Sequence, residues 1–270
     1  MIKKTNQNII FSSFKESFRT INNKKSYFIM LFVVQLAFII IVSGLFAKYA
    51  VEIGEKAQVL MEPLQNISAE MNPLETTQML ERTAGLNDVY NQLKDSVFMF
   101  IIYSIVACLL VNGAAWNTAN LMVNKKPSFL LYGFMFVIVG LIFAIIGLMF
   151  LGIFVNVLTA LGAQTAGFVG LVLYIFVTYF AFISFGLIRK YNVKQLKLLL
   201  RDTFVIGYKQ LGVLFPSYIV VFIILVVIMA IMQRLLFASM PTLTLTLLIF
   251  VLALSWAKVF LLTAVKKVSH

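Results

Sequence analysis

Six long apolar segments constrain this chain more than any other feature of its sequence. A helix needs roughly 20 apolar residues to cross the hydrocarbon core of a bilayer, which is about 30 Å thick. Segments of that length cover residues 27–47, 96–122, 129–155, 168–188, 213–232 and 242–263. The chain is 61% hydrophobic and 12% charged, against about 45–50% and about 25% in soluble domains. The sequence therefore predicts an all-α polytopic membrane protein with six transmembrane helices.

The third and fourth segments are separated by residues 156–167, which carry no charge. Asn156, Gly162, Gln164 and Gly167 are turn-forming residues in this stretch, and they favour a short hairpin loop at the edge of the lipid. A re-entrant segment is the alternative. The N-terminal residues 1–26 are polar and basic, and no small-residue cleavage site follows the first apolar run, so we expect a retained membrane helix and not a signal peptide.

The distribution of Lys and Arg predicts the orientation, because cytoplasmic connections carry an excess of these residues. Of the 22 basic residues, 17 lie in 1–26, 124–128, 189–212 and the C-terminal end of the last span. The other five are Lys48, Lys56, Arg82, Lys94 and Arg234. The acidic residues show the opposite pattern, since all but Glu16 and Asp202 lie in 48–95. We therefore expect a multi-pass protein of the cell membrane with both termini in the cytoplasm.

Residues 48–95 form the largest predicted region outside the membrane. We expect the first membrane helix to continue to Pro63, where proline stops it. Asn72 and Pro73 are typical of a helix start and predict a short helix that ends near Gly85, after which helical spacing resumes toward the second span. This interpretation describes a helical stalk. Asn66, followed by Ile67 and Ser68, matches the acceptor pattern for N-glycosylation.

Basic segments of similar sequence precede three outgoing membrane helices. Lys15-Glu16-Ser17-Phe18 matches Arg201-Asp202-Thr203-Phe204 in residue class, and Asn23–Tyr27 resembles Asn124–Phe129. These matches predict three repeated hairpins, each preceded by a basic segment. Apolar stripes at helical spacing further predict amphipathic helices over 9–22 and 193–211 that lie on the cytoplasmic face of the membrane. The stripes consist of Ile10, Phe14, Phe18 and Ile21, and of Leu196, Leu200, Phe204, Tyr208 and Leu211. Packing against other protein segments is the alternative.

On these spans and basic segments, the chain resembles uncharacterised six-helix membrane families of bacteria and archaea. Those families are similar to the membrane domain fused to some glycerophosphodiester phosphodiesterases. The resemblance implies a style of fold, and no catalytic residue carries over from it.

Side chains suited to catalysis are scarce. The only histidine is His270, the only cysteine is Cys108, and no Asp or Glu lies within a predicted span. Proton-coupled transport, zinc hydrolysis and Ser-His-Asp chemistry all require such groups. We therefore expect no enzymatic activity, no cofactor and no metal site. Apolar runs break up the basic residues, which argues against nucleic acid as a partner.

Two sets of polar residues are candidates for a functional site. Asn112, Trp116, Asn117 and Asn120 gather near the cytoplasmic end of the second span. They line a small polar cavity or, as we favour, form hydrogen bonds between helices. Lys258, beside Trp256 in the last span, is a candidate ligand for a lipid phosphate or a substrate, although we expect its side chain to extend to the interface. Gln35 in the first span presents the same choice.

Contacts with anionic lipid headgroups are the main expected interactions. The candidate residues are Lys15, Arg19, Lys24, Lys25, Lys125, Lys126, Arg201 and Lys258. Other membrane proteins are further candidate partners. The sequence favours a non-enzymatic scaffold, accessory or lipid-interacting protein, and the alternative is a carrier or channel for a lipid or small solute.

Overall fold

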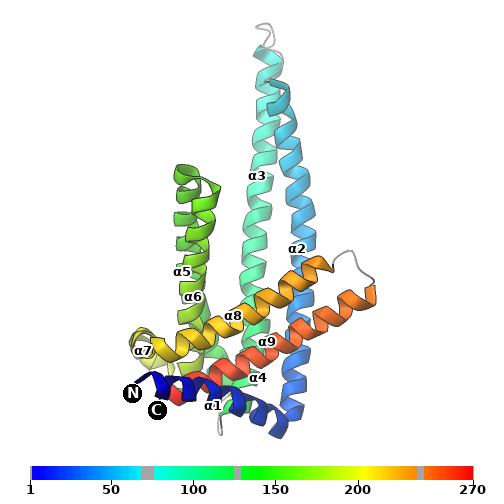
Figure 1. Ribbon diagram of the computed structural model, residues 1–270. Coiled ribbons are helices and arrows are strands. Elements are labelled where there is room, and N and C mark those ends of the chain that lie inside the picture. Colours follow the sequence, from blue (N-terminus) through cyan, green and yellow to red (C-terminus); the bar gives the residue numbers. More distant parts are fainter. Residues whose placement is uncertain (1, 68–75, 125–128, 236–239, 270) are drawn as a thin grey trace. The chain divides into compact units, whose positions relative to one another are not determined.

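The structure is a computed structural model, and it describes residues 2–67, 76–124, 129–235 and 240–269. These residues are helical almost throughout, and none of them lies in a strand (Figure 1). Six of the helical stretches are long and apolar enough to cross a membrane: Lys25–Met61, Asn87–Val123, Phe129–Leu158, Gly167–Lys190, Leu211–Arg234 and Pro241–Val268. The prediction of an all-α polytopic membrane protein with six membrane helices is confirmed.

The chain divides into two compact units. The first unit comprises Met1–Ala37 and Leu109–His270, and the second comprises Phe38–Cys108. Helix α2 (Lys25–Ile67) contributes to both units, whereas α3 (Thr76–Ala107) belongs to the second.

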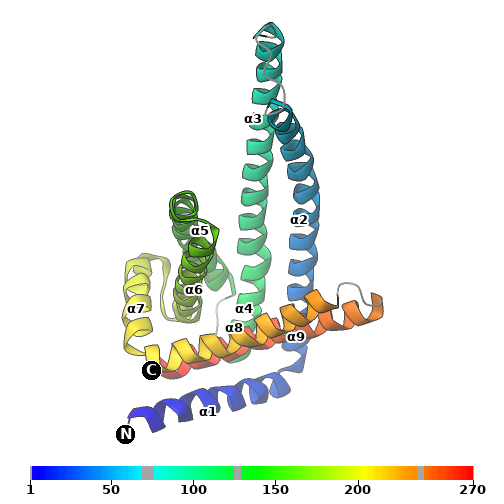
Figure 2. The same cartoon turned by 45° about the horizontal axis from the view of Figure 1, so that its top comes forward.

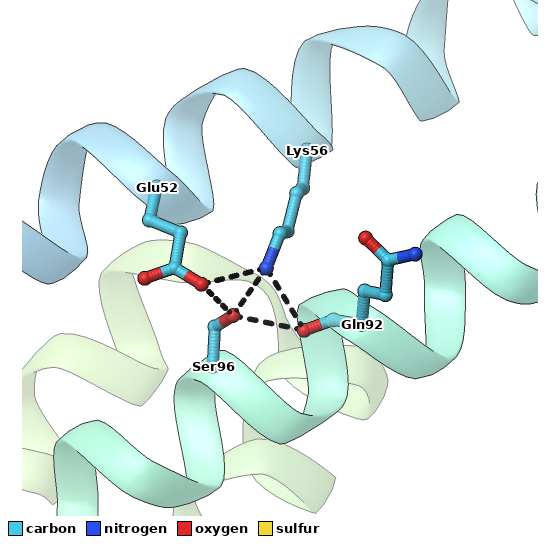
Figure 3. Close-up of polar contacts among 4 residues, drawn as sticks. All are labelled: Glu52, Lys56, Gln92 and Ser96. Atoms are coloured by element: carbon cyan, nitrogen blue, oxygen red, sulfur yellow. Dashed lines mark hydrogen bonds and ion pairs between the residues drawn. The ribbon is translucent and has the colours of Figure 1, made fainter.

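The second unit is a helical hairpin held by ring contacts and one polar network. The ring of Tyr49 lies 5.7 Å from that of Phe100 and 6.2 Å from that of Tyr103. Lys56 Nζ lies 2.7 Å from both Glu52 Oε1 and Ser96 Oγ, and Ser96 Oγ also lies 2.7 Å from Glu52 Oε1 (Figure 3). The three polar groups satisfy one another where the two helices meet.

The hairpin differs from the predicted stalk at two points. Helix α2 continues past Pro63 to Ile67, and α3 runs through Gly85 without interruption. Proline removes one backbone hydrogen bond and glycine costs about 1 kcal/mol relative to alanine, and the long helices on either side offset both costs. The predicted helix start at Asn72 and Pro73 lies outside the described residues.

The connection between the third and fourth spans is a single residue. Helix α5 (Phe129–Leu161) is separated from α6 (Ala163–Leu187) by Gly162 alone, whose φ is +82°. Glycine adopts this φ without steric cost because it has no Cβ. The two helices form the expected hairpin, but the loop does not extend over 156–167, and the re-entrant alternative is wrong. Asn156 donates to the carbonyl of Gly152 within α5, and it therefore does not break the helix.

The first unit is packed most closely at one end of its helices. Fully buried side chains come from the start of α5, the second half of α6, the start of α8 (Leu211–Arg234) and the second half of α9 (Met240–Val268), and they include Met135, Ile183, Leu214 and Phe260. Helix α4 (Gly113–Val123) lies among them and is buried over most of its length. A π-helical turn, η1 (Cys108–Asn112), leads into α4.

The two predicted amphipathic helices are present as α1 (Ile2–Asn23) and α7 (Leu196–Lys209). Helix α1 runs beside α9, and α7 packs against α6 (Figures 1 and 2). On both helices, the most deeply buried residues are not those of the apolar stripes that the sequence predicted. Ser13 and Ser17 of α1 are fully buried, as are Leu199 and Thr203 of α7.

The basic helices that precede two of the three proposed hairpins share a pattern of burial, and the repeat of whole hairpins stays a prediction. When Ser17 is aligned with Thr203, each helix buries the hydroxyl residue and the position four residues before it, while Phe18 and Phe204 stay exposed. Small hydroxyl side chains let the helices approach closely, which places the larger phenylalanines beside the contact. The third proposed repeat lies partly outside the described residues.

Close approach of α6 and α9 predicts the effect of a single methyl group. A Cβ at Gly186 would lie 2.7 Å from Cγ1 and 2.8 Å from Cβ of Val265. We expect Gly186→Ala to destabilise the protein by about 1–3 kcal/mol through overpacking, measured as a lower temperature of loss of monodispersity in detergent. Gly147→Ala is the matched control, because a Cβ at Gly147 meets nothing within 4 Å. Equal stability of the two variants would contradict this packing.

Candidate functional site at the basic end of the helices

Polar and basic groups gather at one end of the first unit, around the last turn of α4. We call this region the basic end, and we define it by Lys24, Arg189, Lys190, Lys266 and Lys267. Here Lys24 donates to the carbonyl of Leu121 at 2.7 Å, and Lys266 donates to the carbonyl of Val123 at 2.7 Å. The final carbonyls of a helix have no partner within the helix, and they carry partial negative charge. The two lysines satisfy these carbonyls from opposite ends of the sequence.

A second network continues from the same helix end. Asn124 donates to Asn120, and Arg189 donates to Asn124. Arg189 also lies 3.5 Å from Ser269 Oγ, and Lys190 donates to the backbone carbonyl of Ser269. The network thus links the end of α4, the end of α6 and the end of α9.

Lys258 lies deeper in the bundle and is only 7% exposed. Its ammonium donates to Asn112 Oδ1 at 2.6 Å and to Gln35 Oε1, and it lies 5.9 Å from the centre of the Trp116 ring. The structure therefore differs from the expected extension to the interface. Two amide oxygens and an aromatic face surround the charge within the bundle instead, and neither hydrogen bond brings a formal negative charge to it.

The three asparagines of the predicted cluster have separate partners. Asn112 contacts Lys258, Asn117 donates to the carbonyl of Phe129 at 2.8 Å, and Asn120 joins the network of Arg189. Trp116 packs against Phe185 with ring centres 5.3 Å apart. These hydrogen bonds link α4 and the turn before it to their neighbours in the way that the packing alternative describes.

A polar hollow of about 500 Å³ lies between α1 and the end of α9. Lys15 and Arg19 line it together with Lys267, and Glu16 is the acid among the lining residues. Lys267 Nζ lies 2.9 Å from both Glu16 Oε2 and Ser12 Oγ. The hollow therefore combines three cationic side chains with one carboxylate, which leaves its local charge positive.

Beside this hollow, α1 carries an exposed aromatic ridge that we define by Phe11, Phe14 and Phe18. Phe11 is 72% exposed and Phe18 is 51% exposed. The rings of Phe14 and Phe18 lie 5.6 Å and 6.0 Å from that of Trp256, whose Nε1 donates to Ser17 Oγ at 3.2 Å. Trp256 thus marks the place where α1 meets α9.

Helix α7 presents a similar arrangement. Phe204 packs on Phe180 at 4.8 Å but remains 45% exposed, and Tyr208 is 80% exposed. Asp202, which corresponds to Glu16, accepts a hydrogen bond from Tyr191. That hydrogen bond, aided by Arg201, holds the pKa of Asp202 below its usual value, so the carboxylate stays charged near neutral pH. Burial, and then the bond to Asp202, raise the pKa of Tyr191 to about 12.

The other predicted residues fall at several places. Lys25 is exposed, and Arg201 is exposed but lies 3.1 Å from Asp202. Lys24 and Lys258 contact protein groups within the first unit. Lys125 and Lys126 lie outside the described residues. Asn66 lies in the last turn of α2, and Ser68 of its acceptor pattern is outside the described residues.

Sequence patterns did not single out Arg189, Lys266 or Lys267 as site residues. The sequence did contain a signal for the buried contact between Gln35 and Lys258. Gln35 is the only amide in the first predicted span, and Lys258 is the only cation in the last. In the part of the chain that the structure describes, no group of three His, Cys, Asp or Glu side chains is arranged to hold a metal ion.

The fold and this site define an all-α polytopic membrane protein whose interhelical polar contacts concentrate at the basic end of its first unit. Comparison of the chain with protein-family models, curated proteins and solved structures found no match. The resemblance to six-helix prokaryotic membrane families therefore stays a prediction.

Neighbouring lysines provide a test of the α4 end. We expect Lys24→Met to destabilise the protein by about 1–3 kcal/mol, because it removes a charged donor from the carbonyl of Leu121. Lys25→Met removes the same charge at an exposed position, where the expected change is within about 0.5 kcal/mol. Thermal unfolding in detergent measures both. A larger loss for Lys25→Met would contradict the assigned role.

Proposed function

We propose that this protein is a non-enzymatic membrane protein that binds anionic lipid headgroups at its basic end, and that it acts there as a scaffold or accessory protein. The observation that carries the proposal is the hollow of Lys15, Arg19 and Lys267 beside the exposed ridge of Phe11, Phe14 and Phe18. A phosphate group matches the hollow, and acyl chains match the ridge.

Physical chemistry favours lipid as the partner of this face. At the boundary between headgroups and acyl chains, the exposed aromatic side chains of a helix contact acyl chains while its basic side chains contact headgroups. Each basic residue near an anionic surface contributes about 1 kcal/mol. Helix α7 repeats the combination, with Phe204 and Tyr208 exposed near Arg201, which supports a shared role for the two helices.

The carrier or channel is the second candidate, and neither the polar hollow on α1 nor the space beside Lys258 supports it. The polar hollow is confined to α1 and the last turns of α9. The space beside Lys258 has walls that are mostly apolar. A coupled carrier also needs membrane-embedded acids or interrupted helices, and the predicted spans contain no Asp or Glu.

The proposal places both termini in the cytoplasm of a cell-membrane protein. To test this orientation, a Cys108→Ser background carries either Asp88→Cys or Lys194→Cys, and a membrane-impermeant thiol reagent is applied to intact cells. We expect labelling at position 88 only, because the excess of basic residues keeps 189–212 inside. Labelling at position 194 alone would invert the orientation.

Trp256 reports on lipid at the ridge of α1. With Trp116→Phe as background, Trp256 is the remaining tryptophan, and its fluorescence is measured in vesicles containing equal shares of brominated phosphatidylglycerol or brominated phosphatidylcholine. We expect stronger quenching by the anionic lipid, decreasing with salt because ions screen exposed charges.

The double change Lys15→Gln and Arg19→Gln should remove the difference between the two lipids. Lys48→Gln with Lys94→Gln is the matched control, since it removes the same charge from the second unit. Equal quenching by the two lipids in the parent protein would overturn the proposal.

A further inference from the structure

Helix α2 is longer than a bilayer requires. Its apolar stretch Lys25–Met61 has 37 residues, and at about 1.5 Å per residue such a helix is about 55 Å long. The hydrocarbon core measures only about 30 Å. The charged residues of this stretch after Lys25 are Lys48, Glu52, Glu55 and Lys56. Residues 48–61 therefore extend beyond the hydrocarbon.

One face of α2 in the second unit carries an uncharged stripe, which we call the α2 seam. Its members are Ile40, Gly44, Ala47, Val51, Gly54, Gln58 and Met61, and all of them are exposed. They recur at alternating spacings of four and three residues, which is the heptad spacing of a coiled coil. Every face of a helix shows a spacing close to this one, so the residue types carry the information. Apolar or small residues fill each position except that of Gln58.

The α2 seam lies opposite the contact with α3. Glu52 and Lys56 point toward Ser96 of α3 (Figure 3). Gly54 and Gln58 follow these two residues by two positions each, which turns an α-helix by roughly 200°. A Cβ added at Gly54 would meet open space. The described part of the hairpin therefore leaves the seam uncovered.

Lipid accounts for the apolar residues of the seam within the bilayer but not for those beyond it. Val51 and Met61 are each 61% exposed, and both lie in the part of α2 that extends beyond the hydrocarbon. Burial of an apolar side chain of this size contributes about 1.5–3 kcal/mol. The stretches Lys25–Met61 and Asn87–Val123 are also the least buried of the six spans. A further helix along α2 would cover this surface.

We propose that the α2 seam pairs with the same seam of a second copy of this chain, as a parallel two-stranded coiled coil. Two copies inserted in one membrane have the same orientation, and a twofold axis along the membrane normal makes each seam residue meet itself. The small residues Gly44, Ala47 and Gly54 let the two backbones approach closely. The proposal goes beyond lipid binding, because the seam shares no residue with the hollow on α1.

Two features of the seam favour a second copy over an unrelated helix. The amide of Gln58 contains both a donor and an acceptor, so two copies of it form hydrogen bonds with each other. A single polar residue of this kind fixes the register of a coiled coil. In a parallel pair, the flanking residues Lys48 and Glu55 face Ser43 and Ala50 of the second copy, and like charges are kept apart at these positions.

Two valines of α2 test the seam directly. In a Cys108→Ser background, an engineered cysteine is the only one in the chain. Val51→Cys lies on the seam, and Val59→Cys is the matched control, because Val59 is 50% exposed but lies off the seam. Membranes containing either variant are oxidised and analysed on a denaturing gel. A disulfide needs Cα atoms within about 7 Å, so we expect at least about tenfold more linked dimer from Val51→Cys.

Equal yields from the two cysteines would indicate random collision and would overturn the proposal. Absence of a linked dimer from Val51→Cys would overturn it as well.

A charge on the seam tests the energetics of pairing. Val51→Lys removes apolar burial from both copies and brings two like charges together, so dimerisation should weaken by more than about tenfold. Val59→Lys is the matched control and should leave dimerisation unchanged. Association is measured from the co-localisation of two fluorophores in liposomes, over a range of protein-to-lipid ratios. If Val51→Lys does not give a monodisperse protein, the two cysteine variants decide the question.

The same measurement identifies the other possible occupants of the seam. A parent protein that stays monomeric at every protein-to-lipid ratio would overturn the proposal and assign the seam to lipid or to a different protein. Liposomes of phosphatidylcholine suffice for this experiment, so its outcome is independent of binding to anionic headgroups at α1.

Discussion

The carboxyl end of α4 is the constraint on which the packing of the first unit depends. A short helix buried on most sides brings its unsatisfied carbonyls away from bulk water, and burial without partners costs several kcal/mol per group in lipid. Lys24 and Lys266 supply the donors, and Arg189 extends the network through Asn124. Because apolar side chains gain little by leaving lipid for one another, these polar contacts select which helices meet.

The helices around α4 repeat a pattern of contact. Helix α7 precedes the hairpin of α8 and α9 and packs on α6, the second helix of the preceding hairpin. Helix α1 precedes the first hairpin and packs on α9, the second helix of the last hairpin. The second helices also meet one another, since α9 contacts both α4 and α6, and Trp116 of α4 packs on Phe185 of α6. The two helices with similar sequences, α1 and α7, thus make similar contacts, and α1 packs on the second helix of the last hairpin.

Length and hydropathy were sufficient to predict six membrane helices, because a bilayer sets the required run of apolar residues. Breaks within helices were not predictable in the same way. Pro63 and Gly85 are helix breakers by propensity, yet the long helices that contain them continue, and Gly162 alone makes a turn where twelve residues were expected to form a loop. Helix propensity gives the free-energy cost of a residue within an isolated helix, and tertiary packing can offset that cost.

The asparagines show why the candidate site was only partly predictable. Helical spacing correctly indicated that Asn117 and Asn120 are buried. It also placed the asparagines in one cluster, because spacing shows only which residues share a face of a helix. Helix α4 has neighbours on several sides, and the π-turn η1 precedes it, so Asn112, Asn117 and Asn120 reach α9, the start of α5 and the loop at Asn124. Partners that lie far apart in sequence, such as Gln35 and Lys258, leave no local pattern.

The docking of α1 on α9 has a consequence for biogenesis. Ser17 and Trp256, which form a hydrogen bond across this contact, are 239 residues apart. At about 5–20 residues per second, a ribosome needs on the order of 10–50 s to make the chain between them. During that interval α1 has emerged, and its serine face has no α9 to pack against. The contact between α1 and α9 can therefore form only after the last helix has been made, so a chain interrupted before α9 keeps Ser17 without the indole of Trp256.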